Sequence, residues 1–500
     1  MSYKLDLSRL QRDSEQSITA QLVELVRSAI EDGSLPPGAK LPTTRALAED
    51  AGVNHLTVVR AYKRLAGEGF VTASRGRGTF VRQAPPTVAS SDGRWQHAVL
   101  PPADRSYIRQ VVADTWRITD DDDHINLAIG WASPELLPVR ELARISREVF
   151  ADAGSDALAY GDPDGLWELR QQIAQRGTEA GFARDADEVV VTSGGRQAIH
   201  LVTRAIVRPG DVVVTESPTY MGSLLSLQDS GARVLGIPYG TEGLDVDALE
   251  QILARHEVKL VAVQGGSQNP TGQDMSPERA GRLLELARER SFFVMEDGVY
   301  STIRFGSGSP RRMRLSAPDH VVYVDSLSKT IGGGLRLGWI AASGEIRRRL
   351  TELKLATDYH TPVLTQHLAA RWLSSGAHER HLTHVSAIYA RRAEAMLGSI
   401  EQRLGDEVLL TPPKGGHHLW ITFRRPIEER VLIAESLRQG VSFTPGGATT
   451  VDGDGLTGLR LSFALLDEER IDEGVRRLAA AVRAVRRAAG AGPRVAPALS

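Results

Sequence analysis

The pattern of hydrophobic and polar positions in the first part of the chain predicts three short helices followed by a β-hairpin. Apolar side chains recur at helical spacing from Ile18 to Ile30, and a turn-forming Pro-Pro-Gly segment follows them. A third helix is predicted over residues 55–67. Two short strands, over residues 70–73 and 79–81, flank a turn that is rich in Gly and Arg.

The second helix of this set is predicted from its end signals. Thr43 or Thr44 can cap the amino end of a helix over residues 45–50, because a hydroxyl oxygen can accept a hydrogen bond from the first free backbone N–H groups. Gly52 stands where a left-handed residue is needed to end that helix. The close spacing of the second and third helices is typical of a helix-turn-helix.

A different pattern begins after Ile125, where short β-rich runs alternate with helical stretches. This alternation predicts an α/β domain with a largely parallel central sheet and a smaller C-terminal α/β part. We therefore divide the chain into an N-terminal domain, a linker rich in Pro, Ser and Asp, an α/β domain and a Pro- and Ala-rich tail. Their expected limits are residues 1–82, 83–124, 125–490 and 491–500.

Composition narrows the possible chemistry. A chain of 500 residues exceeds the size at which one core keeps growing, which agrees with more than one domain. The formal net charge of -2 means that any nucleic-acid site must be a local basic patch. Cysteine is absent, so disulfides, thiolate metal sites and a cysteine nucleophile are excluded, and we expect no metal site.

The location of the protein is predicted from two absences in the sequence. The first residues, MSYKLDLSRLQRDSEQ, are too polar for a secretory signal. No uninterrupted apolar run reaches roughly 18 residues, the length expected of a membrane span. We expect a cytoplasmic protein without a membrane partner.

Basic side chains concentrate in the predicted third helix and hairpin. Only one acidic residue, Glu68, lies between positions 60 and 82, against six basic ones: Arg60, Lys63, Arg64, Arg75, Arg77 and Arg82. Such a patch can neutralise phosphates, and Asn54, His55 and Thr57 at the start of the third helix can reach base edges in the major groove. A solvated helix face, or a three-helix docking module, would give the same charge pattern.

The words LPTTRALAEDAGVNHLTVVRAYKRLAGEGFV and RGRGTFV resemble the winged helix domain of GntR-type regulators across residues 17–82. This resemblance implies binding to double-stranded operator DNA. It assigns DNA contacts to Arg45, Thr57 and Arg60, and to the wing residues Gly76 to Gly78. His55 replaces the Arg or Ser of many relatives, which leaves the base preference open.

Three motifs of the α/β domain suit a flat, phosphorylated cofactor. TSGGRQA follows a predicted strand and opens a helix, so the N–H groups of Gly195 and Arg196 can point at a phosphate. Tyr220, just beyond the next strand, could stack on a pyridine ring, and Asn269 in QNPTG could donate to a phenolate oxygen. Each motif alone is also explained by an ordinary turn or by the core.

A buried carboxylate and a nearby tyrosine add to this set. Asp297 directly follows the apolar run FFVME, and a carboxylate at the end of a buried strand needs a partner. A protonated pyridine nitrogen is such a partner, because the carboxylate keeps the ring able to accept electrons. Tyr300, three residues later, can share the phenolate oxygen with Asn269.

Lys329 in VDSLSKT supplies an amine after another predicted strand. An amine at that place can form a Schiff base with an aldehyde and then act as a base toward a Cα proton. The hydroxyls of Ser326 and Ser328, together with Arg336, would complete a phosphate site. The ordered set therefore predicts pyridoxal 5′-phosphate as the cofactor.

The same residues resemble those of fold type I aminotransferases over residues 125–485. The resemblance implies that Lys329 is the Schiff-base lysine, Asp297 the pyridine partner and Tyr220 the stacking ring. Arg460 in GLRLSFA is similar to the arginine that binds the substrate α-carboxylate. Tyr160 in LAYGDPDGLWELR is similar to a tyrosine that reaches the phosphate of the neighbouring subunit, which implies a homodimer.

A GntR-type domain followed by a fold type I aminotransferase domain resembles the MocR/GabR family of transcriptional regulators, in which head-to-tail dimers are expected. Our leading hypothesis is a regulator that senses an amino acid or amine through its Schiff base with the cofactor. The rival is an active aminotransferase with an accessory DNA-binding domain. The segment EDGVYSTIR departs from many members of the MocR/GabR family, because its Tyr stands three places after the Asp rather than two. This spacing is closer to that of free-standing aminotransferases, which leaves the rival open.

Overall fold

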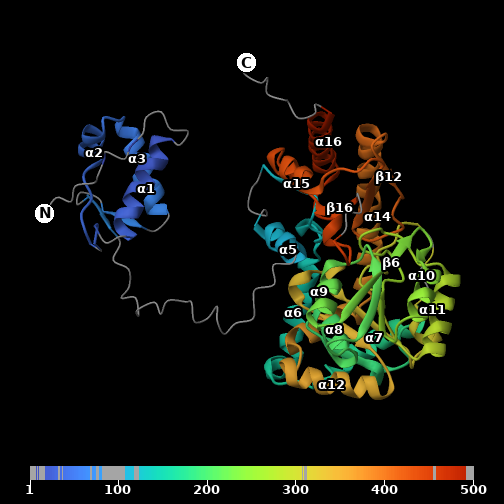
Figure 1. Ribbon diagram of the computed structural model, residues 1–500. Helices are drawn as coiled ribbons and strands as arrows, with labels where there is room; N and C mark the ends of the chain where they lie inside the picture. Colours follow the sequence, from blue (N-terminus) through green and yellow to red (C-terminus); the bar gives the residue numbers. More distant parts are fainter. Residues whose placement is uncertain are drawn as a thin grey trace. The chain divides into compact units, whose positions relative to one another are not determined.

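The computed structural model describes residues 17–81 except 32, 33, 37, 68, 69 and 75–77, residues 107–117, and residues 123–490 except 307, 309–311 and 454–457, together with residues 7 and 10. The chain divides into two compact units, unit 1 (Met1–Ala103) and unit 2 (Asp104–Ser500) (Figure 1). The predicted tail, 491–500, and most of the predicted linker lie outside the described residues.

The described residues of unit 1 form three α-helices and a two-stranded antiparallel hairpin. They are α1 (Ile18–Glu31), α2 (Thr44–Ala51), α3 (His55–Gly67), β1 (Val71–Ser74) and β2 (Gly78–Val81). The apolar stripe of each helix faces one core, to which Leu22, Leu47 and Val58 contribute. This order of elements, with the hairpin as the wing, is a winged helix fold.

Local sequence signals set the ends of α2 as predicted. The Thr43 hydroxyl accepts a hydrogen bond from the Ala46 N–H at 3.2 Å. Gly52 adopts the left-handed conformation, with φ 62° and ψ 38°, and its N–H contacts the carbonyls of the last turn. The Arg- and Gly-rich turn of the wing, residues 75–77, lies outside the described residues.

Unit 2 contains an eight-stranded sheet in the order β4-β11-β10-β9-β8-β5-β6-β7. Strands β4, β5, β6, β8, β9 and β10 are mutually parallel, while β7 and β11 run antiparallel to their neighbours. Their bounds are Val189–Thr192 (β4), Val212–Ser217 (β5), Arg233–Gly240 (β6), Gly243–Leu244 (β7), Val258–Val263 (β8), Phe293–Asp297 (β9), Val321–Ser326 (β10) and Gly338–Ala341 (β11). The predicted largely parallel sheet is confirmed.

Helices cover both faces of this sheet, which explains why its strands are almost continuously apolar. One face packs against α6, α7, α10, α11 and α13, and the other against α8 and α12. The bounds of these helices are Val139–Ala153 (α6), Trp167–Ala180 (α7), Gly195–Ile206 (α8), Val246–Leu253 (α10), Pro277–Arg290 (α11), Gly344–Asp358 (α12) and Val363–Ser374 (α13).

The C-terminal part of unit 2 is a smaller α/β layer. Its sheet has the order β12-β13-β16-β15 and is antiparallel. Helices α14, α15 and α16 pack around it, and a short parallel pair, β3 with β14, joins the start of the domain to this layer. The bounds are Ile125–Asn126 (β3), Ala377–Leu404 (α14), Val408–Leu410 (β12), His418–Phe423 (β13), Glu429–Arg438 (α15), Val441–Ser442 (β14), Thr444–Pro445 (β15), Gly458–Ser462 (β16) and Glu468–Gly490 (α16).

One helix, α5 (Tyr107–Arg117), lies inside the segment that we expected to be a linker. It packs on α9 (Met221–Asp229) of unit 2. Nowhere in the described part of the chain is there a helix with both the length and the apolar character that crossing a membrane requires.

Candidate functional site

Most of the residues predicted to bind the cofactor gather at one edge of the eight-stranded sheet. Asp297 ends β9 and Ser326 ends β10, while Gly195, Tyr220 and Asn269 follow β4, β5 and β8. Because these strands are parallel, their carboxyl ends meet at the same edge, which is where ligands bind in open α/β sheets. The fold therefore brings together residues that are far apart in sequence.

The turn between β4 and α8 has the form of an anion site. Gly194 has φ 94°, a conformation that favours glycine, and it gives the start of α8 no side-chain cap. The N–H groups at Gly195 and Arg196 thus face outward at the positive end of the helix dipole. The close approach of this turn to the sheet depends on Gly338, where a Cβ would lie 2.8 Å from the Gly195 nitrogen.

Hydroxyl and guanidinium groups border the same turn. Ser326 Oγ donates to the Leu337 carbonyl at 3.0 Å, and the Ser326 and Ser328 hydroxyl oxygens are hydrogen-bonded at 2.8 Å. Arg336, held at φ 50°, donates from Nη2 to the Ser193 carbonyl at 2.8 Å. A Cβ on Gly194 would lie 2.9 Å from that Nη2 atom. Backbone N–H groups, hydroxyls and a cation around one point are the donor set that a phosphate monoester requires.

Lys329 ends a short 3₁₀ turn after β10, η7 (Leu327–Lys329), and its amine lies inside the site. Nζ donates to the Gly130 carbonyl at 2.9 Å and lies 5.7 Å from the centre of the Tyr300 ring. Burial, together with the positive charge of Arg460, lowers the pKa of Lys329 to about 8, and Asp297 acts in the opposite direction. An amine with this pKa has a substantial neutral, nucleophilic fraction near neutral pH.

Asp297 is a buried carboxylate, and the surrounding protein does little to stabilise its negative charge. Its Oδ1 accepts a hydrogen bond from the Val299 N–H at 3.1 Å. Burial, with a smaller contribution from the nearby Asp325, raises its pKa to about 7, while Lys329 acts to lower it. A carboxylate in this state is stabilised by an added cationic N–H group, which is what a protonated pyridine nitrogen provides.

Arg460 lies in β16 with only 5% of its surface exposed, and it reaches across to the large sheet. It donates from Nη1 to Asn269 Oδ1 at 3.0 Å, and from Nη2 to the Ala128 carbonyl at 2.6 Å and to Thr444 Oγ1 at 2.9 Å. Its Nε atom has no hydrogen-bond partner among the residues that the structure describes. Burial lowers the pKa of Arg460, so a carboxylate ligand would relieve an uncompensated charge.

The two predicted tyrosines are both in the site, with different surroundings. The Tyr220 ring folds over Gly222, where a Cβ would lie 2.4 Å from its Cζ atom. Burial raises the pKa of Tyr220, while the charge of Arg196 acts to lower it. Tyr300 shares a hydrogen bond with His418 Nε2 at 3.0 Å. The Asn269 Oδ1 atom is taken by Arg460, so within the site Asn269 is bonded to the arginine and Tyr300 to the histidine.

Sequence reasoning missed the histidine pair His417 and His418. The His418 ring lies against Gly130, where a Cβ would be 2.2 Å from its Cε1 atom, and His417 Nδ1 lies 3.3 Å from the Gly130 carbonyl. Burial lowers the pKa of both rings, that of His417 to about 3, so both are neutral. The glycine-rich word KGGHHLW was the available signal, but β13 joins the site only through tertiary packing.

Tyr160 does not take part in this single-chain site. It is 89% exposed and makes edge contacts with the rings of Tyr359 and His360, at centroid distances of 5.9 and 5.6 Å. Its expected role toward the phosphate of a neighbouring subunit stays a prediction.

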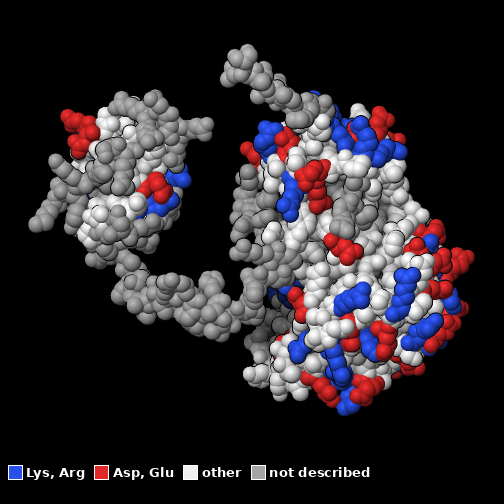
Figure 2. Space-filling model, viewed as in Figure 1, with Lys and Arg blue, Asp and Glu red and all other residues white. Residues whose placement is uncertain are grey.

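In unit 1, the predicted DNA-contacting residues lie around the start of α3. Asn54 Oδ1 accepts a hydrogen bond from the Leu56 N–H at 2.9 Å, and His55 Nε2 lies 2.9 Å from the Thr44 hydroxyl. The patch side chains of this region that are described as exposed are Arg45, Arg60, Lys63 and Arg64. Thr57 is half-buried, and Arg75, Gly76, Arg77 and Arg82 lie outside the described residues. By contrast, basic and acidic side chains are interspersed on the face of unit 2 that Figure 2 shows.

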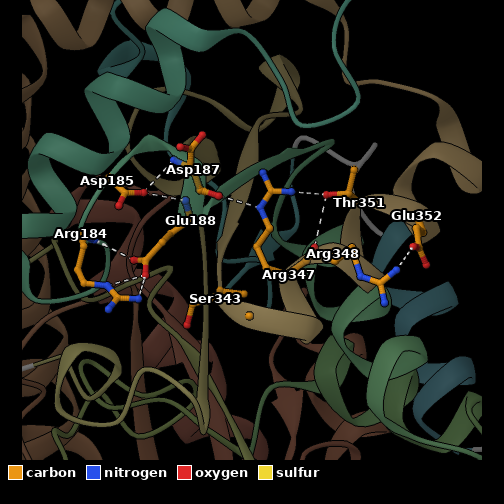
Figure 3. A pocket seen from close by; sticks show the side chains of 11 residues that line it. Arg184, Asp185, Asp187, Glu188, Ser343, Arg347, Arg348, Thr351 and Glu352 are labelled. Carbon is orange, nitrogen blue, oxygen red and sulfur yellow. Dashed lines mark hydrogen bonds and ion pairs between the residues drawn. The ribbon is translucent and has the colours of Figure 1, made fainter.

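A surface groove of about 440 Å³ lies away from the site, beside the amino end of β4 (Figure 3). Its basic side chains are already paired with acids. Arg347 donates to both oxygens of Asp164, and Arg348 pairs with Glu345 and Glu352. Because the opposite end of β4 leads to Gly195, this groove is structural and is separate from the candidate site.

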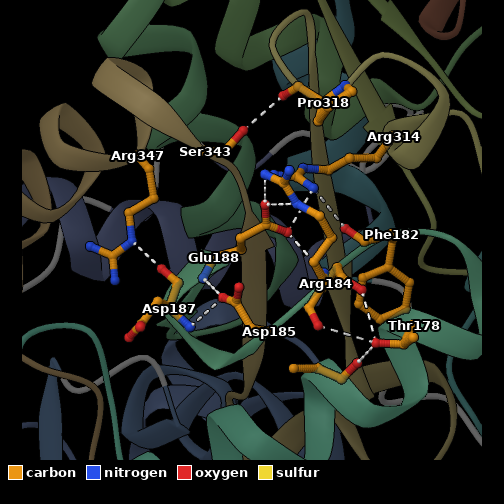
Figure 4. Close-up of polar contacts among 12 residues, drawn as sticks. Thr178, Phe182, Arg184, Asp185, Asp187, Glu188, Arg314, Pro318, Ser343 and Arg347 are labelled. Carbon is orange, nitrogen blue, oxygen red and sulfur yellow. Dashed lines mark hydrogen bonds and ion pairs between the residues drawn. The ribbon is translucent and has the colours of Figure 1, made fainter.

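Glu188 is the centre of the ion pairs behind this groove (Figure 4). Its carboxylate accepts from Arg184 Nε at 2.7 Å and from the buried Arg314 at 3.0 Å. These bonds lower the pKa of Glu188 despite its burial. The cluster fixes the start of β4, and therefore the register of the strand that ends at the phosphate turn.

Two features define the class of protein. Unit 1 is a winged helix, and unit 2 combines an anion turn, an activated lysine, a buried aspartate and a buried arginine at one sheet edge. Inside the described ranges, no cluster of His, Asp or Glu side chains has the arrangement of a metal site. The site therefore has the features expected of one that binds a phosphorylated organic cofactor.

Comparison with known proteins agrees with both units. The family model "Aminotransferase class I and II" matches residues 122–478, and "Bacterial regulatory proteins, gntR family" matches residues 18–81. The 2-aminoadipate transaminase of Thermus thermophilus is 34% identical over 376 residues, which are 74% of this chain and 93% of that protein. The probable rhizopine catabolism regulatory protein MocR of Rhizobium meliloti is 27% identical over 478 residues, 94% of this chain and 95% of that protein.

A solved structure shows the same fold. The α-aminoadipate aminotransferase LysN of Thermus thermophilus, complexed with N-(5′-phosphopyridoxyl)-L-leucine, is 32% identical and has a TM-score of 0.72. The match covers 79% of this chain and 99% of that one. The chain belongs to the class I and II aminotransferase family and, with its gntR-family domain, to the MocR/GabR type of transcriptional regulators. Pyridoxal 5′-phosphate is the cofactor of this family, and the residues at the site fit it.

Proposed function

We propose that this chain is a transcriptional regulator whose affinity for operator DNA changes when its aminotransferase-like site binds a small amino compound. The observation that carries the proposal is the presence of a DNA-binding winged helix and of a site containing Lys329, Asp297 and Arg460 in one chain. A site of this kind gives a DNA-binding protein a means of recognising a metabolite. Coupling requires that the amino compound bind two arrangements of the protein with different affinities.

The phosphate of the cofactor would be held at the start of α8. The N–H groups of Gly195 and Arg196, the hydroxyls of Ser326 and Ser328, and the guanidinium of Arg336 supply its donors. Pyridoxal phosphate supplies an aldehyde that condenses with primary amines and a ring that withdraws electrons from the carbon next to the nitrogen.

The other side chains would orient the cofactor and would hold or accept protons. Asp297 would hold a proton at the pyridine nitrogen, Tyr220 would stack on one face of the ring, and Asn269 with Tyr300 would donate to the phenolate oxygen. Lys329 provides the amine that competes with the amino compound, and its lowered pKa lets it accept a proton. Arg460, with Asn269 beside it, would bind the carboxylate of an amino acid.

Recognition of DNA would fall to the start of α3 and to the wing. Asn54, His55 and Thr57 would read base edges, while Arg60, Lys63 and Arg45 contact the backbone, and Arg75, Gly76 and Arg77 would form the wing contact. Because a regulator must be in the same compartment as its operator DNA, we propose that the protein is cytoplasmic. In this proposal the DNA-binding domain is residues 1–82, the linker 83–124, the cofactor domain 125–490 and the tail 491–500.

A homodimer with head-to-tail arrangement is supported by the surface around Tyr160. Tyr160 contacts Tyr359, and both rings are exposed in the single chain, as are Leu158 by 72% and Trp167 by 46%. Exposed large apolar side chains of this kind are typical of a protein interface. In a dimer, Tyr160 would reach the phosphate site of the other subunit.

The second candidate function is transamination, and the complete donor set around Lys329 favours it. Similarity to the 2-aminoadipate transaminase of Thermus thermophilus supports the same possibility. Turnover of an amino acid with a 2-oxo acid, at about 10 per second as for a median enzyme, would assign the chain to the enzymes.

The proposed regulation is tested by measuring binding of the protein to the DNA upstream of its own gene. We expect the affinity to change when pyridoxal phosphate and a panel of amino acids and amines are added in turn. An affinity that is identical under every condition would overturn the proposal, and turnover without any change in DNA binding would favour the rival.

A further inference from the structure

Helix α5 is the first described element of unit 2, so the chain from the DNA-binding unit enters unit 2 through it. Its apolar side faces inward. Ile108 is buried against Leu224 and Leu225, with Val112 and Met221 beside them. Arg109 forms an ion pair with Asp229 at the far end of α9. These contacts hold the first part of α5 against α9.

Helix α9, against which α5 packs, directly follows the tyrosine that is predicted to stack on the cofactor ring. Tyr220 is the residue directly before α9, and its carbonyl accepts hydrogen bonds from the N–H groups of Ser223 and Leu224. The Tyr220 ring lies over Gly222, close in sequence to the leucines that Ile108 contacts. A displacement of α5 would therefore move the first turn of α9 and the Tyr220 ring with it.

The amino end of α5 contacts a second wall of the site. The Tyr107 hydroxyl donates to Glu429 Oε1 at 2.6 Å, and Glu429 Oε2 accepts from the Gly447 N–H at 3.0 Å. The Tyr107 ring fits because residue 447 is glycine, since a Cβ there would lie 3.1 Å from Tyr107 Cε1. Gly447 belongs to the turn η9 (Gly446–Ala448), which follows directly on β15.

Strand β15 supports the arginine of the site. Thr444 in β15 pairs in register with Arg460, and its hydroxyl accepts from Arg460 Nη2 at 2.9 Å. The two walls are also joined to each other, because the Thr219 N–H donates to the Thr449 carbonyl at 2.7 Å. One helix thus contacts the supports of both the cofactor ring and the carboxylate of the ligand.

We infer that Tyr107 and Ile108 of α5 are positioning residues for Tyr220 and Arg460, and that α5 is the element through which the state of the site reaches the DNA-binding unit. The first part stands on the contacts within unit 2. The second part rests on the proposed function. When Tyr220 and Arg460 are fixed by their ligands, α5 is held in one position, and the chain that leads to unit 1 starts from a fixed point.

The first part is tested by amide hydrogen exchange on the full chain, with pyridoxal phosphate alone as the probe. We expect added pyridoxal phosphate to slow exchange in residues 193–197, which shows that it is bound, and also in α5. Protection of residues 193–197 with unchanged exchange in α5 would overturn the inference, whatever the DNA-binding behaviour.

Two variants then test the coupling. Tyr107→Phe removes the hydrogen bond to Glu429, and Ile108→Ala removes contacts with Leu224 and Leu225. Gln110→Ala, on the exposed side of the same helix, is the matched control. Affinity for the upstream DNA is measured without and with saturating pyridoxal phosphate, and the visible absorbance of the bound cofactor confirms that each variant is folded and loaded.

We expect the wild type and the Gln110 variant to change their DNA affinity at least about fivefold on loading, the lower end of typical coupling. The Tyr107 and Ile108 variants should change it less than about twofold, with the same affinity as the wild type before loading. Variants that keep the full change overturn α5 as the route. A wild type that shows no change on loading, with α5 protected from exchange, overturns α5 as the route to the DNA-binding unit and leaves it as a positioning element alone. Regulation by an amino compound is decided separately, by the panel experiment of the proposed function.

Discussion

Lys329 and Asp297 show how burial makes ordinary side chains reactive. Their residue types and their places after two strands could be predicted from the sequence, because each follows a strongly apolar run. Their altered pKa values could not, since these depend on burial and on Arg460 and Asp325, which the fold brings to the site. The partner of Tyr300 escaped prediction for the same reason, because His418 lies 118 residues away in sequence.

Replacing the site lysine should abolish the covalent link to the cofactor. Reconstituted Lys329→Ala is expected to lack the visible absorbance band that the wild type shows with pyridoxal phosphate, because the variant has no amine at that position. The control is Lys259→Ala, at a surface lysine paired with Glu257. An unchanged band in the Lys329 variant would mean that another amine carries the cofactor.

Asp297 should make the cofactor-free protein less stable as the pH rises. Its pKa is raised to about 7 in the folded chain, above the ordinary value near 4, so the folded state holds a proton that the unfolded state has lost. The stabilisation is complete below about pH 4 and is lost as the pH rises towards 7. Asp297→Asn should flatten this part of the stability profile, measured by urea denaturation at several pH values. Profiles of equal slope would show that Asp297 is not protonated in the folded protein.

His418 should be required for the shape of the site. His418→Ala leaves a cavity beside Gly130 and a buried Tyr300 hydroxyl without its partner, which is expected to cost about 1–3 kcal/mol of unfolding free energy. His418→Gln retains a hydrogen-bonding group and should recover part of this loss. Chemical denaturation measures both, and an alanine variant as stable as the wild type would contradict the assignment.

Among the helices and strands, the elements predicted best from the sequence are those whose ends are set by local signals. The start and end of α2 follow from Thr43 and Gly52, and α3 has the predicted bounds, because caps and apolar periodicity act within one element. The small sheet β12-β13-β16-β15 was expected only as a C-terminal layer, since its pairings join distant segments. Helix α5 was missed because Pro-rich and acidic stretches surround it in the sequence.

The α3 helix should contribute to DNA binding independently of the cofactor site. Arg60→Ala is expected to weaken binding to the upstream DNA and to reduce the slope of log affinity against log salt by about 0.9, the value for one lost phosphate contact. The cofactor absorbance should not change. Arg348→Ala, at an exposed arginine of unit 2, serves as the control. Loss of the absorbance band in the Arg60 variant would show that the two units cannot be separated as proposed.

The whole molecule joins two units that each have their own core. The composition and the motifs could predict both units, because each motif lies within one of them. How the state of one unit acts on the other could not be predicted, since no local pattern encodes an interaction between distant parts of a chain. The contacts of α5 with the walls of the site supply a physical route within unit 2.

The most direct test of the proposed regulation is the DNA affinity of the full chain when pyridoxal phosphate and then the panel of amino acids and amines are added, with wild type and Lys329→Ala measured side by side. We predict that the affinity of the wild type changes at least about fivefold with at least one of these ligands, while that of the variant stays constant. Equal responses of the two proteins, or a wild-type affinity that stays the same under every condition, would contradict it.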